Sequence, residues 1–136
     1  MSTYSEVRNE IMKRFITNFS AIPTAFDNQD IDPPDPSVTV KWVRLNVKFS
    51  NGTQDSFGAS GNRKFLKSGL LIMQVFTAIN AATNVSDTLC QQVQDAFEGV
   101  RIDDIWFFNG GIRFSGSDGE WYQQNVVFDF NFEDVK

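Results

Sequence analysis

The chain of 136 residues contains no histidine and only one cysteine, Cys90. Without histidine it lacks the general base of Ser-His-Asp and Cys-His catalysis, and it also lacks the commonest zinc ligand. A single cysteine cannot form an internal disulfide, which fits a reducing compartment such as the cytoplasm. These absences exclude the usual nucleophilic hydrolases and make a structural zinc site untenable.

Long hydrophobic runs and phosphate-binding signatures are also missing. The longest nearly uncharged stretch, residues 68–86, is interrupted by Gly69, Gln74 and Asn80, so it falls short of a membrane span. The N-terminus has no apolar core of the kind that a secretory signal needs. Neither GxxxxGK[ST] nor a GxGxxG that opens a helix occurs. We therefore expect no export, no membrane segment and no nucleotide-binding loop.

The residues that are present fit one soluble globular domain spanning 1–136. Hydrophobic residues make up 41% of the chain and the formal net charge is −5. A chain of this length buries roughly two-thirds of its unfolded surface, so it folds without a disulfide or a metal. Most of the 14 phenylalanines lie in strand-like segments, which predicts a sheet with an aromatic core.

Two segments have helical periodicity. The first covers residues 4–19, where Thr3 and Glu6 have the spacing of a capping box. The second covers residues 87–98, with Ser86 as the expected N-cap and Gly99 as the residue beyond its end. Apolar residues recur every four positions in both segments: Val7, Ile11, Phe15 and Phe19, then Val85, Leu89, Val93 and Phe97. Cys90 adjoins the second stripe, so we interpret it as a small core-edge residue.

Four further segments are strand-like. Residues 38–49 alternate, and residues 64–80 form a nearly continuous apolar run that is typical of a central strand. Residues 102–114 are interrupted by Asn109-Gly110-Gly111, and residues 120–132 alternate again. The order helix, strand, strand, helix, strand, strand predicts an α+β fold. We expect a mostly antiparallel sheet of four to five strands, with two helices packed on one face and the other face partly open.

One face of each alternating strand is polar but carries a tryptophan. In residues 38–49 this face holds Trp42, Arg44, Asn46 and Lys48, and in residues 120–132 it holds Trp121, Gln123, Asn125, Val127, Asp129 and Asn131. Such a face is either wet or in contact with another protein. Nucleic-acid binding is disfavoured because the few basic side chains on this face, together with the neighbouring Lys41, could not neutralise a phosphate backbone.

All four prolines fall in residues 23–36, PTAFDNQDIDPPDP, together with four aspartates. Carboxylate oxygens suit a hard cation such as magnesium or calcium. The spacing does not match an EF-hand, however, and Asp-Pro pairs hold their aspartates in extended backbone. We therefore predict no metal, catalytic or cofactor site here, but a stiffened connector that Phe26 and Ile31 could anchor on the domain or on a neighbour.

Several segments in order resemble the phage tail-terminator-like (tail completion) proteins of long-tailed siphophages. They are IPTAFDNQDIDPPDP with VKWVRLNV, then GASGNRKFLKSGLLIMQVF, AFEGVRIDDIWF and GEWYQQNVVFDFNFE. The likeness runs from about residue 6 to residue 133. It rests on the order and spacing of soft motifs, and no catalytic signature is among them.

This resemblance implies a structural virion protein and no enzyme. Members of the family form a homohexameric ring that caps the tail tube, ends tube polymerisation and provides the head–tail joining surface. The implied partners are further copies of the chain, the major tail tube protein and a head-completion or connector protein. The implied location is the head-proximal end of the tail, after assembly in the host cytoplasm. DNA passes the lumen without specific binding, which an acidic wall favours.

A closed ring with head-to-tail contacts needs two different faces on each protomer. The candidate interface residues are Phe26, Ile31, Trp42, Arg44, Trp121, Gln123 and Asn125. Trp42 and Trp121 fit an interface as well as ordinary partly exposed aromatic positions. Two alternatives remain open: another small neck or tail adaptor protein that uses the open sheet face without a ring, and an enzyme with a carboxylate metal site.

Overall fold

The computed structural model describes residues 3–26, 41–54, 56–79, 83–118 and 120–136. The described residues form two helices and six strands. In chain order they are α1 (Tyr4–Asn18), β1 (Thr24–Phe26), β2 (Lys41–Gln54), β3 (Lys64–Ala78), α2 (Thr83–Phe97), β4 (Arg101–Ile102), β5 (Ile105–Asp118) and β6 (Trp121–Val135). No helix in these ranges is long and apolar enough to cross a membrane.

The strands form a single sheet in the order β1-β2-β3-β6-β5-β4. All neighbouring pairs are antiparallel except β1 and β2, which are parallel. The α+β class is confirmed, but the prediction of four to five strands is wrong, because the sheet has six and is mixed. The two additional strands are the edge strands β1 and β4, of three and two residues, which are too short to produce a periodic sequence pattern.

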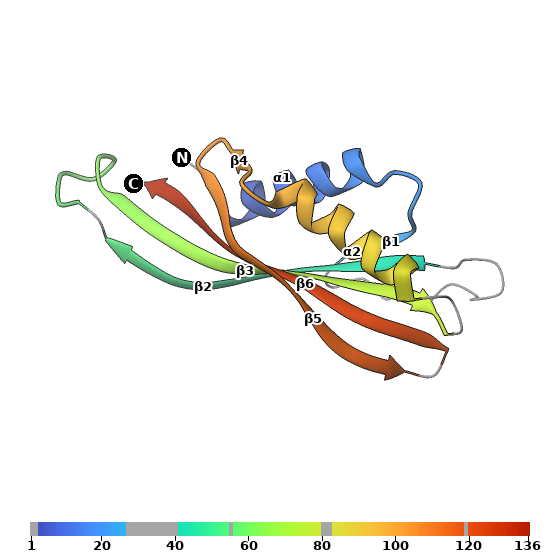
Figure 1. Ribbon diagram of the computed structural model, residues 1–136. Coiled ribbons are helices and arrows are strands. Elements are labelled where there is room, and N and C mark those ends of the chain that lie inside the picture. Colours follow the sequence, from blue (N-terminus) through green and yellow to red (C-terminus); the bar gives the residue numbers. More distant parts are fainter. Residues whose placement is uncertain (1–2, 27–40, 55, 80–82, 119) are drawn as a thin grey trace.

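Both helices cover the same face of the sheet, as predicted (Figure 1). At the start of α1 the Glu6 amide donates to Thr3 Oγ1 at 3.2 Å, which confirms the cap. Helix α2 begins earlier than predicted, so Ser86 is not its N-cap. Ser86 is fully buried one turn inside the helix, where its small side chain allows close packing. Gly99 has a φ of +69°, as expected for the residue that ends a helix.

The main core lies between the helices and the sheet. It contains most of both predicted helical stripes, whereas Phe19 packs against its edge and Val85 is half-buried outside the cluster. It also contains many inward side chains of the long strands. In β6 these are Gln124, Val126, Phe128, Phe130 and Phe132, so the alternation predicted for this strand is confirmed.

Strand β5 continues through the segment that the sequence presents as an interruption. A bulge lies between Phe108 and Gly111, and a second lies between Phe114 and Gly116. Asn109 adopts a positive φ of 55° at the first bulge. Gly110 is packed so closely that an added Cβ would lie 2.4 Å from the Phe128 ring. The glycines therefore bend β5 over an aromatic core without ending it.

Candidate interaction surface

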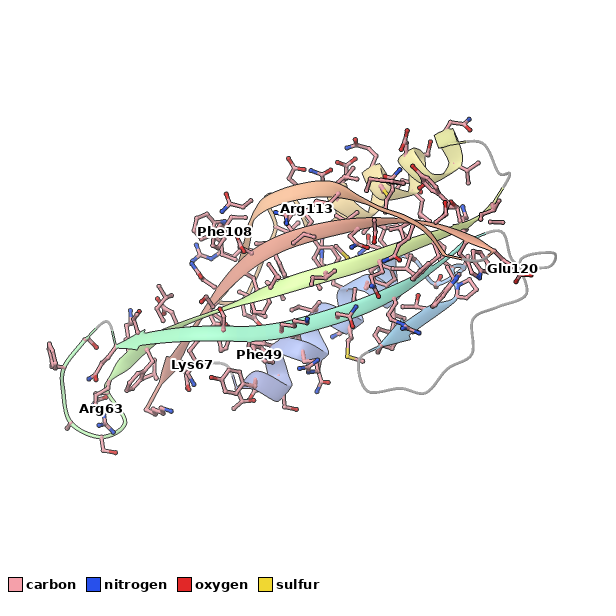
Figure 2. The ribbon with its side chains drawn as sticks, turned by 90° about the horizontal axis from the view of Figure 1, so that it is seen from below. Phe49, Arg63, Lys67, Phe108, Arg113 and Glu120 are labelled. Atoms are coloured by element: carbon pink, nitrogen blue, oxygen red, sulfur yellow. The ribbon has the colours of Figure 1, made fainter. Side chains whose placement is uncertain are left out.

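The side of the sheet opposite the helices, called here the open face, is seen from below in Figure 2. Its residues follow from the strand register, because directly paired residues point to the same side. They include Trp42, Arg44, Asn46 and Lys48 of β2, Lys64, Leu70, Ile72, Gln74 and Phe76 of β3, Arg101 of β4, Trp106, Phe108 and Arg113 of β5, and Trp121, Gln123, Asn125, Val127, Asp129, Asn131 and Glu133 of β6.

Five of the predicted interface residues lie together on the open face. Trp42 is paired through Phe76 with Gln123, and Arg44 through Gln74 with Asn125. The rings of Trp42 and Trp121 are 6.2 Å apart between centroids. The Arg44 guanidinium lies 5.5 Å from the centre of the Trp42 ring. Strand pairing therefore brings these residues from β2 and β6 into one patch.

The two tryptophans are more buried than an interface anchor would be. Trp42 is 3% exposed and Trp121 is 7% exposed. Trp42 stacks on Phe76 at 4.3 Å, and Ala25 completes a second, smaller core with them. The interpretation of these tryptophans as partly exposed aromatics is thus wrong. Within the protomer they stabilise the end of the sheet where β1 adds to β2.

Amide side chains form a hydrogen-bonded row beside this cluster. Gln123 Nε2 donates to Asn125 Oδ1 at 2.9 Å, and Asn46 Nδ2 donates to Gln74 Oε1 at 3.2 Å. All four side chains are half-buried. These bonds hold the row in place and leave it partly accessible to a partner.

The exposed aromatic part of the open face was not predicted. The rings of Trp106 and Phe108 lie 4.8 Å apart between centroids and are tilted by 31°. Trp106 is 47% exposed and Phe108 is half-buried. Their partners in β6 are Asn131 and Asp129. The sequence signal was the triplet Trp106-Phe107-Phe108, in which the middle residue is buried and the outer two share the other face. Gly110 and Gly111, which follow directly, interrupt the alternation, so the sequence did not reveal which side of the strand Trp106 and Phe108 occupy.

Of the other two predicted interface residues, one lies on the helix side and one falls outside the described residues. Phe26 is paired with Leu45 and packs against the main core, so it lies on the helix side. Ile31 and the aspartates of the proline-rich segment lie outside the described residues. Among the residues that are described, no three His, Cys, Asp or Glu side chains are grouped so that they could hold a metal ion.

Cys90 is a residue of α2 and is buried in the core, in line with the interpretation from the sequence. Its Sγ donates to Gln124 Oε1 at 3.5 Å. Burial, the largest cause, raises the pKa of the thiol to about 11. Cys90 is therefore a protonated core residue at neutral pH, which does not suit a nucleophile.

A cavity of about 710 Å³ opens near the C-terminal ends of the two helices. Its lining includes Arg14, Asn18, Lys41, Gln92 and Asp95. Arg14 Nε is already bound to the Ala96 carbonyl at 2.7 Å. The remaining groups are of mixed charge and converge on no single type of ligand, so the open face is the better candidate for function.

No family model and no curated protein matches the chain. A solved protein structure matches with a TM-score of 0.63 at 12% sequence identity, over 95% of this chain and 97% of that chain. Likeness at this identity establishes the shared fold and carries no information on function.

Proposed function

We propose that the protein is a structural virion protein, a tail terminator. In this role six copies form a ring on the finished tail tube, stop its polymerisation and offer a joining surface to the head. The proposal starts from the sequence resemblance to the tail-terminator-like family. The net charge of −5 suits a ring through which DNA slides without sticking.

The observation that carries the proposal is the open face, on which Trp106 is exposed beside the half-buried Phe108. One side of the sheet is covered by the chain's own helices, whereas the other presents aromatic, amide and basic side chains. Exposed aromatic residues are favoured at protein interfaces. A protomer with two chemically different sides also meets the requirement of a closed ring with head-to-tail contacts.

The direct test is electron microscopy of tails assembled with and without this protein. Without it we expect tubes of uncontrolled length that do not join heads, and adding the purified protein during assembly restores a single length. Tubes of normal length in its absence would refute the proposal. Tubes of normal length that fail to join heads would instead indicate a neck or tail adaptor protein.

A further inference from the structure

We infer that the open face of one protomer docks on the outer surface of helix α2 of a second copy. This inference rests on the proposed ring, in which each protomer meets two neighbours through different surfaces.

The open face is basic although the whole chain is acidic. The charged side chains described on this side of the sheet are Arg44, Lys48, Lys64, Arg101, Arg113, Asp129 and Glu133. Five are basic and two are acidic, which gives this side a net charge of +3, against −5 for the chain. Lys64 and Glu133 lie 3.9 Å apart and compensate each other, so the excess comes from the bases of β2, β4 and β5.

The outer surface of α2 has the opposite charge. The helix contains no lysine or arginine, and it is followed by Glu98. Its exposed residues are Asn84, Asp87, Thr88, Gln91, Gln92 and Asp95. Arg14 reaches α2 from the side of α1, where it bonds the Ala96 carbonyl and lies 5.9 Å from the Phe97 ring centre. Asp87 accepts a hydrogen bond from Gln124 Nε2 at 3.0 Å on the side of the sheet. The carboxylates that the outward side offers to a basic partner are therefore those of Asp95 and Glu98.

The two surfaces lie on opposite sides of the protomer. Helix α2 lies above the sheet in Figure 1, whereas Phe108 and Arg113 lie along β5 in the view from below in Figure 2. Docking one surface on the other repeats head to tail, and such a contact closes into a ring when its rotation permits. Trp106 and Phe108 would supply the apolar centre, while complementary charges fix the orientation.

The test uses two charge-reversed variants of the full chain. One variant reverses the open face with Lys48→Glu and Arg113→Glu. The other reverses α2 with Asp95→Lys and Glu98→Lys. All four side chains are exposed, so both variants should fold, which circular dichroism checks. The control variant is Arg63→Glu with Lys136→Glu, which changes the net charge by the same amount as the first variant. Its two positions lie outside both proposed surfaces, where residues 63 and 136 exchange backbone hydrogen bonds.

Assembly is measured by native mass spectrometry and sedimentation. We expect each reversed variant to self-associate at least about tenfold more weakly than the wild type, which corresponds to about 1.4 kcal/mol. The control variant should assemble normally. An equal mixture of the two reversed variants should regain the wild-type mass, because each basic surface then meets an acidic one. A six-membered ring permits this strict alternation.

Three results would overturn the inference. Reversed variants that assemble as well as the wild type would leave the ring intact but place its contacts elsewhere. A mixture that stays dissociated would exclude this pairing of surfaces. Loss of binding to duplex DNA in the Lys48→Glu and Arg113→Glu variant, with unchanged self-association, would make the open face a nucleic-acid site. The proposed function itself is tested separately by tail length.

Discussion

Gly69 is the position in β3 where adding one methyl group should do the most damage. It is buried beside Phe49 of β2 and Phe130 of β6. A Cβ at this position would lie 2.4 Å from Phe130 Cζ and 2.5 Å from the Lys48 carbonyl oxygen. The phenyl ring can turn, but the carbonyl belongs to the neighbouring strand. Gly69→Ala therefore has to displace β2 from β3.

Overpacking of this kind costs about 2 kcal/mol of unfolding free energy. For a domain of this size each kcal/mol corresponds to about 4 °C in Tm, so we expect Tm to fall by about 8 °C. The assay is thermal unfolding followed by circular dichroism, with urea unfolding as an independent measure of the free energy.

Gly111→Ala is the matched control, because it lies in β5 on the same sheet and an added Cβ would meet no atom within 4 Å. Its Tm should stay within about 4 °C of the wild type, since an unstrained alanine changes stability by only a few tenths of a kcal/mol to about 1 kcal/mol. Phe130→Leu should recover part of the loss in Gly69→Ala by making room beside residue 69. Equal Tm values for Gly69→Ala and Gly111→Ala would refute the close packing described for β2, β3 and β6.

Three further predictions concern buried groups. Iodoacetamide at pH 8 should leave native Cys90 unmodified and alkylate it only after unfolding. Folding raises the pKa of the Cys90 thiol from 9.0 to about 11. The contribution of the protonated thiol to the unfolding free energy should therefore be lost as the pH rises between these values. The hydrogen bond from Lys67 to Asp134 at 2.8 Å raises the pKa of Lys67. The free-energy difference between the wild type and Lys67→Gln should therefore be constant from neutral pH to about pH 10 and shrink above it, whereas a difference that persists at high pH would contradict this origin. Trp121→Ala should lower the unfolding free energy of the monomer by about 3 kcal/mol in urea; a defect seen only in assembly would show that Trp121 is not part of the protomer's own core.

Strong periodicity made much of the architecture predictable. Val7, Ile11 and Phe15 recur with helical spacing and all are fully buried. The alternation of Phe128, Phe130 and Phe132 located the inner face of β6 without any tertiary information. Because a shift by one residue would reverse that face, the same alternation also fixed which residues of β6 lie on the open face.

The remaining features depend on contacts that leave no periodic signal. Strand β1 exists because residues 24–26 reach β2 in parallel, with the Val43 amide bound to the Pro23 carbonyl at 3.1 Å. The burial of Trp42 follows from Phe76 and Trp121, which come from two other strands. The exposure of Trp106 became evident only when the bulge at Asn109 fixed the register of β5.

Cryo-electron microscopy of the head-proximal end of assembled tails can locate this protein directly. We expect a ring of six copies of this chain at that end, with the open face of each copy against α2 of its neighbour. Density for this chain at another position, or its absence from finished tails, would refute the proposed role.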